Sequence, residues 1–168
     1  MAVKEILRLG NPGLGKVCAA VKDAGKPETK KIIRDLKDTL ENFKKKNGFG
    51  RAIAAPQIGI LKRIIYVDCP KYKISGALIN PKIIKKSKEK IRVWDDCFSF
   101  PELLVKVERA KEIKVKYQAK GGESHTITTK GDLSELLQHE IDHLDGILAV
   151  QRAIDGKSFA FRKEWEKF

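Results

Sequence analysis

The sequence predicts an α+β fold in which antiparallel β-sheets pack around one buried central helix. Candidate strands outnumber candidate helices along the 168 residues. The segments between strands are too short for the helical crossovers that join parallel strands, so the strands are expected to be mostly antiparallel. A helix over about residues 132–144 has apolar side chains on a wide sector and is therefore expected in the core. We expect residues 1–168 to form a single domain.

Turn residues and hydrophobic periodicity place the elements in order. Pro12-Gly13 predicts an early turn. A helix is expected over residues 28–46, because apolar side chains recur there at the helical period and Asn47-Gly48 follows them. A final helix is expected from about Ser158, with its aromatic side chains on one side. Strands are expected at residues 63–68, 76–79, 81–86, 90–94, 112–119 and 124–129.

The ends of the central helix carry recognisable signals. Asp132 is a good N-cap, and Glu135 three residues later would complete a capping box. Gly146 follows the last turn, where a residue in the left-handed conformation often ends a helix. A buried helix of this kind would hold any ligand side chains rigidly.

The stretch His139-Glu140-Ile141-Asp142-His143 has the spacing of a metal site. Residues four apart lie on one face of a helix, so both imidazoles can reach one ion. Glu140, between them, is placed to act as a general base on water. Two histidines and a carboxylate in this pattern indicate metal-assisted hydrolysis.

Composition limits the remaining functional classes. No apolar run approaches the roughly 18 residues of a membrane span, and no secretory signal peptide is expected at the N-terminus. Three widely spaced cysteines do not form a disulfide framework and favour the cytoplasm. The net charge of +13 favours encounters with polyanions such as RNA. The lysines are scattered among acids, however, so neither a membrane nor a sequence-specific nucleic-acid partner is expected.

A hydrolytic metal site usually has a third protein ligand and an open position for water. The late carboxylates Asp145, Asp155, Glu164 and Glu166 are one source. The other is Cys97, which follows the strand expected at residues 90–94 in polar, turn-forming surroundings. A third carboxylate from Glu164 or Glu166 would indicate a zinc endopeptidase, whereas a thiolate would give a site with two histidines and one cysteine.

With these motifs, the chain resembles the peptide deformylases, which remove the formyl group from the N-terminal formylmethionine of nascent polypeptides. The resemblance rests on three motifs in order, at residues 50–57, 95–99 and 138–146. It implies that Cys97, His139 and His143 bind one divalent metal ion, ferrous iron, with zinc, nickel or cobalt able to substitute. It also implies that the partners are N-formylated nascent peptides. The positive net charge leaves open a transient contact with the RNA-rich ribosome.

The resemblance further implies roles around the metal. Glu140 would transfer the proton between water and the leaving amine. The side-chain amide of Gln57 and the backbone N–H of Phe98 would donate to the oxyanion. The first motif, with Gly50, would provide extended backbone along which a substrate peptide pairs.

Several residues at the substrate side depart from the family pattern. Asp95 replaces a glutamate, Ala52 replaces a glycine, and Arg51 and Glu135 stand where apolar or small residues are usual. We expect Arg51 and Glu135 to pair at the mouth of the pocket, so that formylmethionine peptides still enter. The alternative is a more polar formylated or acylated substrate. A catalytically inactive binding module is a third hypothesis, which the intact Glu140 and Gln57 argue against.

Overall fold

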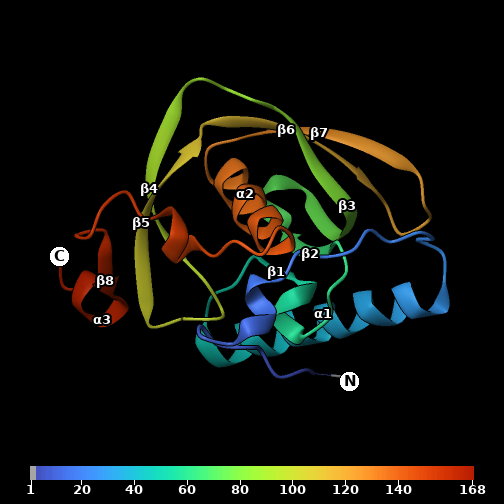
Figure 1. The fold of residues 1–168 in the computed structure, drawn as a ribbon, viewed down its shortest axis with the longest axis horizontal. Helices are drawn as coiled ribbons and strands as arrows, with labels where there is room; N and C mark the ends of the chain where they lie inside the picture. The colour runs from blue at the N-terminus through green and yellow to red at the C-terminus, as the bar shows by residue number, and fades with distance from the viewer. Residues whose placement is uncertain (1–2) are drawn as a thin grey trace.

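Two antiparallel sheets surround a buried helix in the structure, a computed structural model that describes residues 3–168 (Figure 1). The larger sheet has the strand order β1-β2-β3-β6-β7 and the smaller has the order β4-β5-β8. Every pair of neighbouring strands is antiparallel, as the sequence predicts. The strands are β1 (Ala52–Ala54), β2 (Ile64–Cys69), β3 (Ile74–Lys86), β4 (Lys90–Asp96), β5 (Leu103–Ala110), β6 (Glu112–Gln118), β7 (Ser124–Lys130) and β8 (Phe159–Phe161).

Helices cover both faces of the larger sheet. Helix α2 (Asp132–Leu144) packs Leu137 and Ile141 against the apolar side chains of β2 and β6. Helix α1 (Pro27–Asn47) packs an apolar stripe against the opposite face, over β1 and β2. The remaining helical segments are short: α3 (Arg162–Trp165) and the 3₁₀ helices Pro12–Gly15, Ala55–Ile58, Pro70–Tyr72 and Ala149–Arg152.

The residues at both ends of α1 stabilise its termini, and the helix ends at Asn47-Gly48 as the sequence predicts. Pro27 lies in its first turn, and Gly48 ends it in the left-handed conformation with φ of 78°. Lys44, Lys45 and Lys46 occupy the last turn, where positive charge interacts favourably with the helix dipole.

The two strands expected at residues 76–79 and 81–86 form one strand, β3. Asn80, with φ of 51°, and a shift in register between Ile79 and Lys82 mark the place where the sequence suggested a break. The Asn80 side chain bonds both the N–H and the C=O of Val21, so a neighbouring segment stabilises the irregular backbone. An Asn-Pro pair therefore produces a bulge here and does not end the strand.

The prediction of a capping box at the start of α2 is wrong. Gly131 is the N-cap residue, and no side chain caps the helix. Asp132 is the first helical residue, and its carboxylate accepts a hydrogen bond from Tyr72. Glu135 bonds Arg51, so its side chain is directed to another part of the chain.

The prediction that the final helix starts at about Ser158 is also wrong. Residues Phe159–Phe161 form β8, which pairs with Leu103–Val105 of β5, and only the four residues of α3 are helical. Arg162 donates to the carbonyl of Pro101 and to the carboxylate of Asp96, which attaches this segment to the smaller sheet. These contacts are distant in sequence and local periodicity does not report them.

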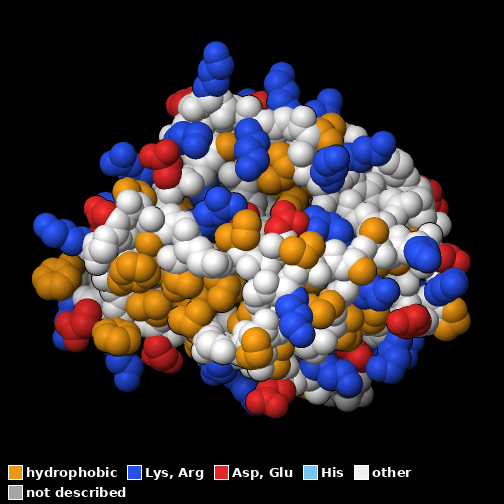
Figure 2. Space-filling model, viewed as in Figure 1, with side chains coloured by type: hydrophobic (Ala, Val, Ile, Leu, Met, Phe, Trp, Pro, Cys, Tyr) orange, Lys and Arg blue, Asp and Glu red, His pale blue; other side chains and the backbone are white. Residues whose placement is uncertain are grey.

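Within residues 3–168, no helix has the length and apolar character that crossing a bilayer requires. Basic and acidic side chains are interspersed on the face in Figure 2, with the basic ones in excess.

Candidate metal centre and substrate cavity

Two separate elements bring three metal-binding side chains together. Cys97 directly follows β4, whereas His139 and His143 project from one face of α2. His143 Nε2 lies 3.3 Å from Cys97 Sγ and 3.1 Å from His139 Nε2. All three ligand atoms lie within 4.8 Å of one another, and all three residues are buried. The separation is suitable for simultaneous contact with one ion.

The chemistry of this cluster fits a cation. His139 Nδ1 lies 2.8 Å from Asp95 Oδ1. That contact favours the proton on Nδ1 and leaves a lone pair on Nε2, which faces the other two ligand atoms. Sulfur and imidazole nitrogen lone pairs converging in a dry site repel one another unless a proton or a metal ion lies between them. One thiolate and two imidazoles also form a donor set used by divalent transition metals.

A chain of charges that runs from buried Asp95 to exposed Arg152 supports the centre from behind. Arg109 donates to Asp95 at 2.9 Å and also bonds Asp142 on α2. Asp142 in turn accepts from Arg152 at 2.9 Å. Burial alone would raise the pKa of Asp95, but His139 and Arg109 outweigh it and lower the pKa to about 2. Asp95 therefore stays ionised and orients His139.

Glu140 lies beside the three ligands with a partly unsatisfied carboxylate. It is buried, and its Oε2 has no hydrogen-bond partner among residues 3–168. Burial raises the pKa of this carboxyl to about 7. A proton-transfer group with a pKa near neutrality can both accept and release a proton at physiological pH.

Gln57 is held with its amide nitrogen towards the cysteine. Its Oε1 accepts a hydrogen bond from the backbone N–H of Ala54 at 2.9 Å. Its Nε2 lies 3.6 Å from Cys97 Sγ and 3.3 Å from Ser99 Oγ. The bond to Ala54 fixes the orientation of the amide, so its donor end faces the metal-binding cluster.

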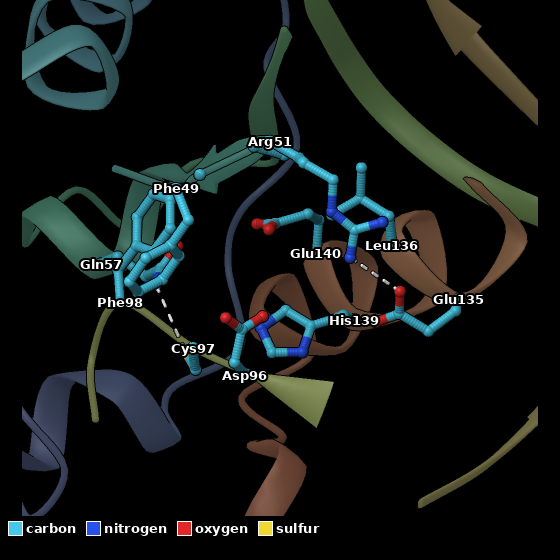
Figure 3. Close-up of a pocket in the computed structure, with 12 residues that line it drawn as sticks. Phe49, Arg51, Gln57, Asp96, Cys97, Phe98, Glu135, Leu136, His139 and Glu140 are labelled. Atoms are coloured by element: carbon cyan, nitrogen blue, oxygen red, sulfur yellow. Dashed lines mark hydrogen bonds and ion pairs between the residues drawn. The ribbon is translucent and has the colours of Figure 1, made fainter. Parts of the chain in front are cut away.

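A cavity of about 160 Å³ opens over these groups (Figure 3). The expected ion pair is present on its wall, where Arg51 Nη2 lies 3.0 Å from Glu135 Oε2. Burial raises the pKa of Glu135 to about 7, and Asp95 adds to that shift against the pull of Arg51. The lining residues are Phe49, Gly50, Arg51, Ala52, Gln57, Asp96, Cys97, Phe98, Glu135, Leu136, His139 and Glu140.

The ring of Phe98 makes Gly50 necessary. Phe98 stacks on Phe43 of α1 with ring centroids 3.9 Å apart. A Cβ added at Gly50 would lie 2.8 Å from Phe98 Cζ, and Gly50 has φ of 137°, a conformation that glycine adopts readily. The phenylalanine in the second motif is thus accommodated by the glycine of the first.

Among residues 3–168, the other candidate acids and cysteines do not join the cluster of Cys97, His139 and His143. Asp95, expected at the substrate side, does not line the cavity and lies behind His139. Glu164 is exposed and pairs with Lys167, and Asp145 pairs with Arg63. None of these acids, nor Glu166, joins the cysteine and histidines in the described part of the chain. Cys18 and Cys69 are buried among apolar side chains, as expected of free cysteines.

Sequence reasoning missed three contributors: Arg109, Asp142 and Ser99. Asp142 lies inside the histidine motif, and its contacts with two arginines depend on strands and loops elsewhere in the chain. The available signal was the charge of Arg109 at a position that strand alternation places on the inner face of β5. A charged residue at such a position indicates a buried partner.

Comparison with known proteins decides the family. The family model described as polypeptide deformylase matches residues 3–159. The chain belongs to the polypeptide deformylase family. The peptide deformylase of Carboxydothermus hydrogenoformans is 39% identical over 153 residues, which cover 91% of this chain and 95% of the relative. Peptide deformylase 1 of Prochlorococcus marinus is 36% identical and covers 99% of this chain and 88% of its own length.

Solved deformylase structures have the same fold. The crystal structure of peptide deformylase from Thermotoga maritima superposes with a TM-score of 0.83 at 34% identity, covering 92% of this chain and all of that one. The Ehrlichia chaffeensis peptide deformylase, solved in complex with actinonin, gives a TM-score of 0.84 at 28% identity and covers 94% of this chain and 92% of its own. The expected family and fold class are thereby confirmed.

Proposed function

We propose that Cys97, His139 and His143 hold one divalent metal ion at which this single-domain deformylase, residues 1–168, cleaves its substrate. Membership of the family makes the chain a hydrolase that removes the N-formyl group from nascent polypeptides. The convergence of one sulfur and two Nε2 atoms beside Glu140 is the observation that carries the residue assignment. When bound, the ion supplies Lewis-acid chemistry that polarises the formyl C=O and activates water.

Glu140 moves the proton in this proposal. Its carboxylate takes a proton from the attacking water and delivers it to the amine that leaves when the C–N bond breaks. The pKa of about 7 suits both steps at neutral pH. Gln57 Nε2 and the backbone N–H of Phe98 donate to the developing oxyanion, a role for which each donor is worth on the order of 3 kcal/mol.

The first motif orients the substrate peptide. Strand β1 is an edge strand of the larger sheet and pairs only with β2. Its open edge accepts the extended substrate as an added strand, with Gly50 and Ala52 beside the substrate backbone. Arg51 and Glu135 line the space for the first side chain, and their mutual pairing lets an apolar methionine side chain enter without facing an unpaired charge.

We assign ferrous iron as the resident ion, with zinc, nickel or cobalt able to substitute, because imidazole and thiolate accept all four. The compartment we propose is the cytoplasm, where the three cysteines stay free. Action on nascent chains implies transient contact with the ribosome.

Release of formate from formyl-Met-Ala-Ser by anaerobically purified protein tests the function. Protein loaded with Fe²⁺ or Ni²⁺ should hydrolyse this peptide and should leave acetyl-Met-Ala-Ser intact. Formyl-Asp-Ala-Ser and formyl-Ser-Ala-Ser test the pocket, because the paired charges are expected to favour the methionine peptide. Faster turnover of the polar peptides would assign the Arg51–Glu135 pair to recognition of a different formylated substrate.

A further inference from the structure

A second, larger groove lies between the N-terminal half of α1 and β3. Its volume is about 670 Å³, within the range of ligand-binding sites, and it shares no lining residue with the substrate cavity. One wall is α1, and the opposite wall is the end of β6 with the turn that leads to β7 (Figure 1). Nothing in the deformylation chemistry uses this groove.

The walls of the groove carry four cations and no acidic side chain. Lys30, Arg34 and Lys37 are spaced four and three residues apart, so they form one stripe along α1. Lys120 approaches from the turn after β6. Among residues 3–168, Lys37 forms an ion pair with Glu41 at 3.7 Å, whereas Lys30, Arg34 and Lys120 form none. Three uncompensated cations around one hollow favour an anionic occupant.

Aromatic rings and open backbone complete the groove. Tyr66 and Tyr117 line it, and both are half-buried. One face of the Tyr117 ring is stacked on His125, with ring centroids 5.7 Å apart, so only its other face can take a base. The segment from Ile74 to Leu78 pairs with β2 on one side, while pairing with β6 begins only at Ile79. The other edge of this segment therefore leaves backbone N–H groups available to the groove, and such groups bond phosphate oxygens.

We propose that this groove binds single-stranded RNA without sequence specificity. Cations that follow a phosphate backbone, combined with aromatic rings on which bases stack, are the features by which proteins bind single strands. An acidic peptide could use the open strand edge and the cations, but it would not use the ring of Tyr66 or the remaining face of Tyr117. The proposal does not rest on the assignment of the catalytic residues.

Fluorescence anisotropy with a fluorescein-labelled twelve-residue oligouridylate tests the proposal on the full chain. Phosphate contacts from the three uncompensated cations predict that log K falls with log salt concentration with a slope of about −2.1. Lys30→Ala combined with Arg34→Ala should weaken binding about tenfold or more and reduce the slope by about 1.4. Lys45→Ala combined with Lys46→Ala removes the same charge from the same helix outside the groove, and should leave binding within about twofold.

Two further probes separate the ligand classes. Tyr117→Leu keeps apolar packing and removes the ring, so it should weaken oligouridylate binding several-fold and leave inorganic polyphosphate unaffected. Equal losses in the two double variants would overturn the proposal, because the charge would then act diffusely. Groove-dependent binding of labelled octaglutamate as tight as that of the oligonucleotide would also overturn it, and would assign the groove to acidic peptides. Unchanged melting temperature and formate release confirm that the variants fold.

Discussion

Replacing Arg51 with leucine leaves Glu135 buried without its partner. The Glu135 side chain is only 8% exposed, so the carboxylate cannot recover its hydration, whereas the Arg51 side chain is 40% exposed. Because water screens the arginine, we expect a loss of about 1–3 kcal/mol, the cost of leaving a buried polar group unsatisfied, which is below the roughly 3–5 kcal/mol for breaking a fully buried ion pair. For a chain of this size, about 2–4 °C in Tm accompanies each kcal/mol, so Tm should fall by about 2–12 °C.

The reverse single change should be milder. Glu135→Leu leaves an arginine that can turn to water, at a cost below about 1 kcal/mol. The double variant Arg51→Leu with Glu135→Leu removes both charges and should be nearly as stable as the wild type, since apolar residues can replace such a pair. The cycle should therefore give a coupling energy of at least about 1 kcal/mol.

Urea unfolding of the metal-loaded protein measures all four corners of this cycle, and the KM for formyl-Met-Ala-Ser measures its effect on the cavity. The double variant should bind this peptide at least as well as the wild type. Additive losses, or an Arg51→Leu variant as stable as the wild type, would refute the reasoning, because the pair would then not compensate the buried carboxylate.

Three further predictions follow from single contacts. Gly146→Ala should lower Tm by more than Gly59→Ala, because both glycines have positive φ but only at Gly146 would a Cβ meet backbone, at 2.6 Å; thermal denaturation compares them. The hydrogen bond from Lys44 lowers the pKa of Asp68, so its contribution to stability is present above pH about 4 and is lost as pH falls below that. Lys44→Met should return the pKa of Asp68, measured by NMR titration, towards its usual value. Cys97→Ser should reduce bound metal well below one equivalent by elemental analysis, and retention of a full equivalent would remove the cysteine from the ligand set.

Local sequence patterns were sufficient to predict the two histidines of the site and the glutamate between them. The spacing of His139 and His143 follows from helix geometry alone, and Glu140 lies between them. Identification of Cys97 needed the resemblance between motifs, because spacing alone left the late carboxylates open. The Arg51–Glu135 pair joins residues that are 84 apart in the sequence. It was predicted only because both residues depart from the family pattern at positions that the resemblance places at the mouth of the substrate pocket.

Non-local contacts explain what the sequence did not predict. Strand β5 supplies Arg109 and the centre of the smaller sheet, yet the interval after the second motif was not identified as a strand. Phe159–Phe161 adopts strand geometry because Leu103–Val105 offers it a partner. The cationic groove combines α1 with a turn that lies over eighty residues later in the chain, so no window of sequence contains it.

The role of Glu140 in moving the proton can be measured as the rate of formate release from formyl-Met-Ala-Ser by Glu140→Gln, beside the wild type with equal bound metal. Glutamine keeps the shape of the side chain and removes its ability to take up a proton. We expect kcat to fall at least about 100-fold, the lower range for a general acid–base group, with one equivalent of metal retained. Turnover within a few-fold of the wild type would mean that another group moves the proton, and would rule out this role for Glu140.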